Sequence, residues 1–252
     1  MRVRMTGLAG FVAVAALLAT APPASAAPGD ASAHGAELDL SLLGGNAVSA
    51  GPFAAADANG PTTGTFATAN VPGVLKTGVL DTSATRDDKT GGVHSRAVTA
   101  DVRLELLASA TGAITAEAVE AECDATQKGV VGRTKLVGVG LGRLGEVEAE
   151  PAPNTVLDVG LVGVDIARVV FNEQVRNRDG SLTVNAIHVT LIGGVLGALG
   201  SGDLVVSSAT CGPAGLPIPM ASGAGLWIGL GLLALVAVPT GAVVLRRRRA
   251  LV

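Results

Sequence analysis

Apolar and polar residues alternate one by one over several stretches of this chain, a period of two that predicts β-strands. Residues 36–42 alternate in this way, and residues 98–106 do so most clearly, with Asp101, Arg103 and Glu105 among the polar positions. A helix would spread these charges around its whole surface. Residues 114–123 alternate as well, and we expect a strand there although their Ala and Glu residues favour helix.

A β-hairpin is expected in the second half of the chain. Residues 166–176 and 182–192 flank the turn sequence Asn177-Arg178-Asp179-Gly180, in which Gly180 can supply a positive φ. Residues 204–211 form the last expected strand. Many short strands separated by glycine-rich turns are typical of an all-β sandwich, which we place at residues 27–211.

The segments between these strands are expected to be irregular. Residues 27–33 are small and polar and predict a flexible start, and residues 49–65 are rich in Gly, Pro, Ala and Thr and predict a loop. Residues 71–80 lead into a polar turn at residues 86–92.

The N-terminus has the pattern of a secretory signal peptide, residues 1–26. Arg2 and Arg4 precede an apolar run at residues 7–19, which is too short to span a bilayer. The small residues Ala24 and Ala26 suit a signal peptidase, so we expect cleavage between Ala26 and Ala27.

The C-terminus predicts a single transmembrane helix. Residues 226–245 carry no charge and would be about 30 Å long as a helix, enough to cross the hydrocarbon core. Residues 212–225 would then be a linker, and residues 246–252 a basic cytoplasmic tail. The lipid bilayer is thus an expected partner. Gly225 and Gly229 have the G-x-x-x-G spacing of helix-dimer faces, so dimerisation through this helix is an open alternative. Translocation is opposed by the four basic residues Arg246, Arg247, Arg248 and Arg249. The protein is therefore expected in the cell membrane, with its N-terminal domain outside and its C-terminus in the cytoplasm.

Charge and aromatic content narrow the partners of the outer segment. Two of the 18 Lys and Arg residues precede the expected cleavage site and four follow the apolar segment, whereas all 21 Asp and Glu residues lie between, giving the outer segment a net charge of −9. This disfavours nucleic acid as a partner, because nucleic acid binding needs a basic face. Phe53, Phe66 and Phe171 are the outer aromatic residues, so surfaces for stacking bases or sugars are scarce.

Cys123 and Cys211 are the two cysteines of the chain. Both fall in the part expected outside the cell, where disulfides persist, and we expect them to pair. A reactive thiol or a metal ligand pair is the alternative, although no His or third Cys is spaced beside either of them.

Several short sequences resemble the actinobacterial choice-of-anchor P family of surface proteins. They are residues 71–80 (VPGVLKTGVL), 149–155 (AEPAPNT), 172–174 (NEQ), 182–189 (LTVNAIHV) and 209–212 (ATCG). The resemblance covers most of the outer segment and implies an exported domain joined to a C-terminal anchor. It implies no activity, because the family has none established.

Covalent attachment to a cell wall is the alternative to anchoring by the helix. The residues before the apolar segment are Leu216-Pro-Ile-Pro-Met220, which depart from a Leu-Pro-x-Thr-Gly sorting signal. Pro219 stands where Thr would form the acyl-enzyme, and Met220 stands where Gly would leave. We therefore expect retention by the helix.

Two motifs suggest ligands but have simpler explanations. Gly140, Gly142 and Gly145 fit G-x-G-x-x-G, with Asp165 further on as a dinucleotide site requires. However, prolines at 151 and 153 would break the helix that must follow, so a glycine-kinked strand is expected instead. Carboxylates that could hold Ca²⁺ occur without EF-hand spacing, and a solvated acidic surface explains them better: Glu146, Glu148, Glu150, Asp87 and Asp88.

The histidines His34, His94 and His188 are too far apart in sequence to form a local metal motif. His188 could belong to a triad assembled in space, but the chain lacks a G-x-S-x-G elbow. The amides of Asn172, Gln174 and Asn185, together with Glu173, are expected to bind neighbouring backbone groups.

The sequence accordingly predicts no catalytic residues, cofactor or metal site. The first hypothesis is a non-enzymatic surface protein with a structural, adhesive or binding role and an unknown surface partner. The alternative is a membrane-tethered extracellular hydrolase, which would require Glu173, His188 and a serine or carboxylate to converge in one cleft.

Overall fold

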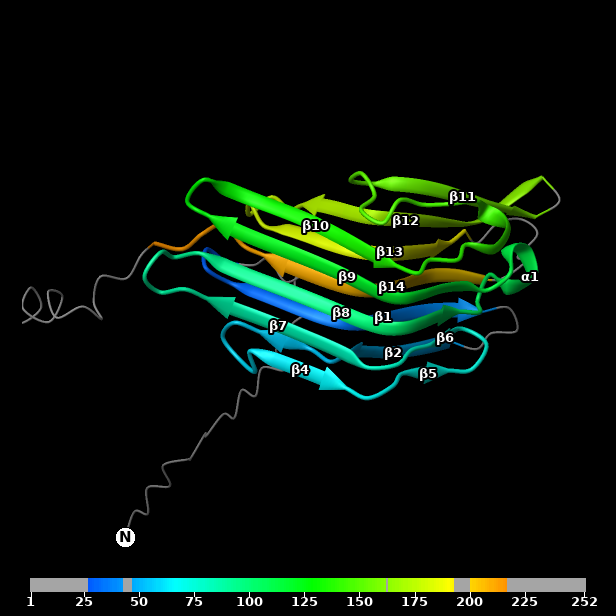
Figure 1. The fold of residues 1–252 in the computed structure, drawn as a ribbon, viewed down its shortest axis with the longest axis horizontal. Helices are drawn as coiled ribbons and strands as arrows, with labels where there is room; N and C mark the ends of the chain where they lie inside the picture. Colours follow the sequence, from blue (N-terminus) through cyan, green and yellow to red (C-terminus); the bar gives the residue numbers. More distant parts are fainter. Residues whose placement is uncertain (1–26, 43–46, 162, 193–199, 217–252) are drawn as a thin grey trace, which may run out of the picture.

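The computed structural model describes residues 27–42, 47–161, 163–192 and 200–216 as two packed antiparallel sheets (Figure 1). Its strands, in chain order, are β1 (Ala31–Leu42), β2 (Ala47–Phe53), β3 (Ala56–Asp57), β4 (Thr63–Phe66), β5 (Asn70–Val71), β6 (Leu75–Lys76), β7 (Leu80–Arg86), β8 (Val93–Leu104), β9 (Ile114–Thr126), β10 (Gly129–Val137), β11 (Thr155–Leu161), β12 (Val164–Arg176), β13 (Leu182–Leu191) and β14 (Gly200–Cys211). Two short helical turns, α1 (Ala108–Thr111) and η1 (Gly142–Leu144), lie between strands.

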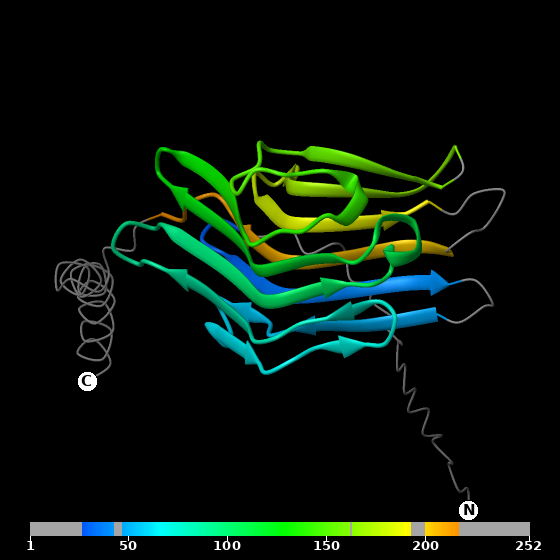
Figure 2. The same ribbon diagram turned by 45° about the vertical axis from the view of Figure 1, so that its right-hand side comes forward.

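Sheet A has the order β11-β12-β13-β14-β1-β2, with β3 also paired to β1. Sheet B runs β10-β9-β8, after which β8 pairs with β7 along its first half and with β6 near its end. The remaining strands extend that sheet, β4 beside β7 and β5 beside β6. The two sheets lie face to face in both ribbon views (Figures 1 and 2). The expected all-β fold is confirmed, with a sandwich-like arrangement of the described residues.

Small aliphatic side chains from both sheets fill the space between them. Phe171 of β12 is the largest of the fully buried side chains, and Leu38, Ile187 and Leu204 are buried beside other Leu, Val and Ala residues. Ser207 of β14 places its hydroxyl 2.9 Å from Thr99 Oγ1 and 2.8 Å from the carbonyl oxygen of Val119, both in sheet B. The interior therefore combines apolar contacts with a polar link between the sheets.

The expected disulfide is confirmed and joins the two sheets. Cys123 lies in β9 of sheet B and Cys211 ends β14 of sheet A, with Cα atoms 5.7 Å apart. Both residues are fully buried, so the bond crosses the core instead of the surface.

An irregular row of residues crosses sheet A and changes which side chains face outward. Asn172 in β12 has φ of 50° and Ser207 in β14 has φ of 56°, and the register places them on either side of Ala186 in β13. In a regular strand Glu173 would share a face with the buried Phe171. The positive φ at Asn172 interrupts the alternation, and Glu173 instead contacts polar side chains of β13.

Strands were expected where β1, β8, β9, β12, β13 and β14 lie, and the structure confirms these expectations. The loop expected at residues 49–65 is wrong, since β2, β3 and β4 occupy much of it. The flexible start is wrong from Ala31 onward, because β1 begins there. The sequence pattern does not reveal these elements because their residues are mostly small, and none in β2 or β4 is fully buried.

The described residues contain no helix long and apolar enough to cross a membrane. The predicted signal peptide, the transmembrane segment at 226–245 and the basic tail lie outside the described residues, as does the expected linker beyond Leu216. These assignments remain predictions.

Candidate functional site

The outer face of sheet A carries a polar cluster centred on His188. We call His188, Glu173, Asp203 and Asn185 the His188 cluster. His188 Nδ1 lies 2.8 Å from Glu173 Oε2, and its Nε2 lies 3.0 Å from Asp203 Oδ1. Because β12, β13 and β14 are adjacent, one histidine on the central strand can reach a carboxylate on each neighbour.

Amide and hydroxyl groups complete the His188 cluster. Asn185 donates through Nδ2 to Glu173 Oε2 at 2.7 Å, and Ser208 donates to Asn185 Oδ1 at 2.7 Å. The hydrogen bond from His188, opposed by burial, lowers the pKa of Glu173. The same hydrogen bond raises the pKa of His188, whereas burial acts to lower it. The arrangement therefore favours an imidazolium between two carboxylates.

This geometry does not assemble a nucleophile with a general base. A hydrolytic triad needs one ring nitrogen of the histidine facing the nucleophile. Both nitrogens of His188 face carboxylates. The Thr190 hydroxyl lies 3.4 Å from Nε2 but donates to Asp203 Oδ1 at 2.8 Å, and the Ser208 hydroxyl donates to Asn185. The convergence of Glu173, His188 and a carboxylate that the hydrolase hypothesis required is thus present, but as an ion-paired cluster.

A hollow of about 440 Å³ lies beside the cluster on the same face. His34 and Glu37 of β1, Asn185 of β13 and Ser208 of β14 contribute to its lining, while His188 does not. Burial lowers the pKa of His34, an effect that nearby Glu37 opposes. The hollow is thus a depression on the sheet that the ion-paired histidine does not line.

Stability should depend on pH through His188. The pKa of His188 is raised in the folded state, so its contribution to the free energy of unfolding is fully present below the unfolded pKa near 6.5. That contribution is lost as pH rises through the folded pKa. We expect His188→Gln to cost about 1 kcal/mol at pH 6 and less at pH 9. Thermal unfolding of the full chain in mild detergent at both pH values measures this.

Subtracting the free energy of unfolding of His188→Gln from that of the wild type at each pH removes the opposite contribution of His34, which both chains carry. That residue has a lowered pKa, so its contribution is present above about 6.5 and is lost as pH falls. An equal loss at pH 6 and pH 9 would show that His188 acts through packing alone.

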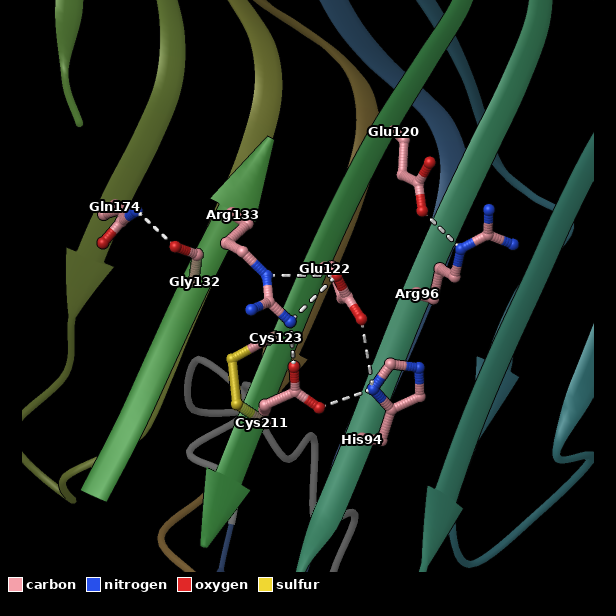
Figure 3. Close-up of polar contacts among 10 residues, drawn as sticks. His94, Arg96, Glu120, Glu122, Cys123, Gly132, Arg133, Gln174 and Cys211 are labelled. Atoms are coloured by element: carbon pink, nitrogen blue, oxygen red, sulfur yellow. Dashed lines mark hydrogen bonds and ion pairs between the residues drawn. A yellow bond between two sulfur atoms is a disulfide. The ribbon is translucent and has the colours of Figure 1, made fainter. Parts of the chain in front are cut away.

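A second polar group lies on the outer face of sheet B (Figure 3). We call His94, Glu122 and Asp124 the His94 cluster. His94 of β8 lies directly opposite Asp124 of β9, and their Nδ1 and Oδ1 atoms are 2.7 Å apart. The same Nδ1 lies 3.7 Å from Glu122 Oε1, because Glu122 is two residues along β9 on the same face.

Arg133 of β10 approaches the same carboxylates from the other side. Its Nη2 lies 2.8 Å from Asp124 Oδ2 and 3.2 Å from Glu122 Oε2. Next along the strands, Arg96 pairs with Glu120. A hollow of about 490 Å³ adjoins this face, lined partly by Glu120, Glu122 and Arg133 and partly by residues 150–153.

The glycine motif does not form a dinucleotide site. Gly140 pairs with Thr115 in an isolated bridge, and Gly142 begins a single turn of 3₁₀ helix that ends at Leu144. The three-residue turn offers no α-helix N-terminus for a pyrophosphate. The expected glycine-kinked strand is wrong, since positive φ values at Gly142 and Gly145 turn the chain instead.

The expected acidic groups are solvated. Glu146, Glu148 and Glu150 are exposed between η1 and β11. Asp87 organises its own turn by accepting hydrogen bonds from the Lys89 backbone nitrogen and the Thr90 hydroxyl, and these bonds lower its pKa. These residues need no cation to explain their positions.

The amide predictions are correct in part. Asn172 donates to the carbonyl oxygen of Pro151 at 2.7 Å, and Gln174 donates to that of Gly132 at 3.0 Å. Asn185 and Glu173 bind side chains instead of backbone.

Sequence reasoning missed the His94 cluster and the place of Asp203. Glu120, Glu122 and Asp124 alternate along β9, which could have placed three carboxylates on one face. The pairing of that face with His94 could not be found, because the strand register joins residues 30 positions apart.

Comparison with known proteins gives no relative for this chain. No family model, no curated protein and no solved structure matches it.

Proposed function

We propose that this chain is an exported surface protein, anchored by its C-terminal apolar segment, whose outer domain has a structural, adhesive or binding role. The observation that carries the proposal is the buried disulfide between Cys123 and Cys211. Such bonds form and persist in oxidising compartments and are rare in the cytosol. This agrees with the signal peptide at residues 1–26 and with the resemblance to choice-of-anchor P proteins.

The two ends of the outer domain lie together, which suits a domain carried on a single anchor. The backbone nitrogen of Gly29 donates to the carbonyl oxygen of Pro213 at 2.8 Å, and that of Gly212 donates to the carbonyl oxygen of Asp30. Further along, Gly215 donates to the carbonyl oxygen of Gly91 in the β7–β8 turn, and Gln127 donates to that of Gly215. The chain leading toward residue 226 therefore starts from the end of the sandwich that holds this turn (Figure 1).

The chemistry of the outer faces supports binding over hydrolysis. Both ring nitrogens of His188 are bonded to carboxylates, so neither is free to activate a nucleophile. The polar clusters on both sheets and the hollows beside them offer contacts to a partner. We therefore do not propose the hydrolase alternative.

Membrane anchoring is tested by fractionation and tag accessibility. We expect the full chain to stay in membranes washed with alkaline carbonate, and a tag placed after Val252 to resist external protease in intact cells. Replacing Leu235 and Val236 by Arg should release the protein, because each charge at the helix centre opposes insertion by about 2.5–3.5 kcal/mol.

The matched control exchanges the same two residues as Leu235→Val and Val236→Leu, which preserves hydrophobicity and should preserve anchoring. A wild-type chain extracted by carbonate, or a tag cleaved in intact cells, would contradict the proposed topology.

A further inference from the structure

We propose that His94, Glu122 and Asp124 on the outer face of sheet B bind one divalent metal ion of the Zn²⁺ type. One donor atom from each residue, a histidine nitrogen or a carboxylate oxygen, lies within 4.8 Å of the other two. The three side chains are half-buried and come from adjacent strands, so the sheet fixes their relative positions. Imidazole nitrogen with carboxylate oxygen is a donor set that Zn²⁺ accepts.

The two carboxylates converge on one nitrogen. His94 Nδ1 lies 2.7 Å from Asp124 Oδ1 and 3.7 Å from Glu122 Oε1 (Figure 3). A single proton on Nδ1 can be donated to Asp124, whereas Glu122 lies beyond hydrogen-bond range. A metal ion would contact all three atoms at once. Ligand atoms at Zn²⁺ distances in a tetrahedron are about 3.3 Å apart, a value between the two separations seen here.

Arg133 holds the carboxylates by the oxygens that the ion would not use. Its guanidinium contacts Glu122 Oε2 and Asp124 Oδ2, whereas Oε1 and Oδ1 face His94. Hydrogen bonds to the outer oxygens of ligating carboxylates orient them in metal sites. With neutral His94, two carboxylates and one guanidinium still sum to a negative charge, which attracts a cation.

The His188 cluster shows why the same residue types need not make a metal site. There Glu173 faces Nδ1 and Asp203 faces Nε2, on opposite sides of the imidazole ring. One ion cannot contact both carboxylates and a ring nitrogen in that arrangement. His188 therefore provides a matched comparison within the chain, another histidine flanked by two carboxylates without convergence.

Three protein ligands leave at least one coordination position for water or an external group. Of the three ligands, Glu122 also lines the hollow of about 490 Å³, together with Glu120 and Arg133. The site would thus present a metal ion on the surface of sheet B.

The test is a titration of the full chain with Zn²⁺ alone, in mild detergent, after chelator treatment and without a histidine tag. Calorimetry should show one ion bound per chain. His94→Gln should weaken binding by about 100-fold or more, because even the partners of metal ligands contribute 10-fold to 100-fold. His188→Gln should bind Zn²⁺ as the wild type does.

Absence of stoichiometric binding to the wild type, or unchanged affinity in the His94→Gln chain, would overturn the proposal. Equal losses in the two histidine variants would also overturn it. If His94→Gln lowers the thermal stability too far for titration, nitrogen NMR of the wild-type histidines replaces it. Zn²⁺ should then shift the ring signals of His94 and leave those of His188 in place, and the reverse pattern would refute the site.

Discussion

A chain carrying Cys123→Ala and Cys211→Ala should unfold about 4–5 kcal/mol more easily than the wild type. The two residues are 88 positions apart, and closing a loop of that length restricts the unfolded chain by this amount in the chain-entropy model. In the folded state the disulfide also joins β9 of sheet B to β14 of sheet A across the core. Alanine is preferred to serine, since a hydroxyl at these fully buried positions would add a separate cost.

Thermal unfolding of the full chain in mild detergent measures the effect, and the melting temperature should fall by roughly 8–20 °C. Wild-type protein treated with a reductant is the matched control and should show nearly the same fall. A double variant that melts within about 2 °C of the oxidised wild type would contradict this account, because the bond would then contribute almost nothing to stability.

The pairing of the cysteines was predictable because it needed only composition and compartment. Two cysteines in a segment expected outside the cell can form one intramolecular bond. The strands that bury one face on the core were predictable too, since residues 98–104 alternate between apolar and polar side chains and residues 204–206 are an apolar run.

The strands that were missed lie toward sheet edges or carry little bulk. β10 begins Gly-Val-Val-Gly and is an edge strand paired on one side only, and β2 is also an edge strand, with one face exposed and the other only half-buried. Such strands are held by ladder hydrogen bonds to a neighbour, which leave no periodic pattern in the sequence.

The polar clusters could be predicted only in part. Glu173, Asn185 and His188 were singled out along the chain, but their partner Asp203 depends on β14 lying beside β13. The outward position of Glu173 depends further on the positive φ of Asn172, which the sequence only permits. Asn is one of the residue types that tolerate a positive φ, so its presence at position 172 permits the change of face but does not predict it.

Phe171→Ala should destabilise the outer domain by about 3–5 kcal/mol, the largest effect expected from truncating one core side chain. Phe171 is fully buried in β12 and is the largest of the fully buried side chains. Its neighbours in the core are Leu, Val, Ile and Ala residues. An interior built from such small side chains contains few groups able to move into the space that the ring leaves, so most of the cavity should persist.

Phe66→Ala provides the matched control for this variant. Phe66 lies in β4, is 42% exposed, and contacts Phe53 with ring centroids 5.2 Å apart. Losing that contact should cost about 1 kcal/mol, so thermal unfolding of the two full-length variants separates core packing from the mere loss of an aromatic ring. Similar losses in both variants would mean that the interior repacks around position 171. Since a domain of this kind has about 5–15 kcal/mol of stability in total, a distinct loss at Phe171 would show how strongly a core with so few large side chains depends on one of them.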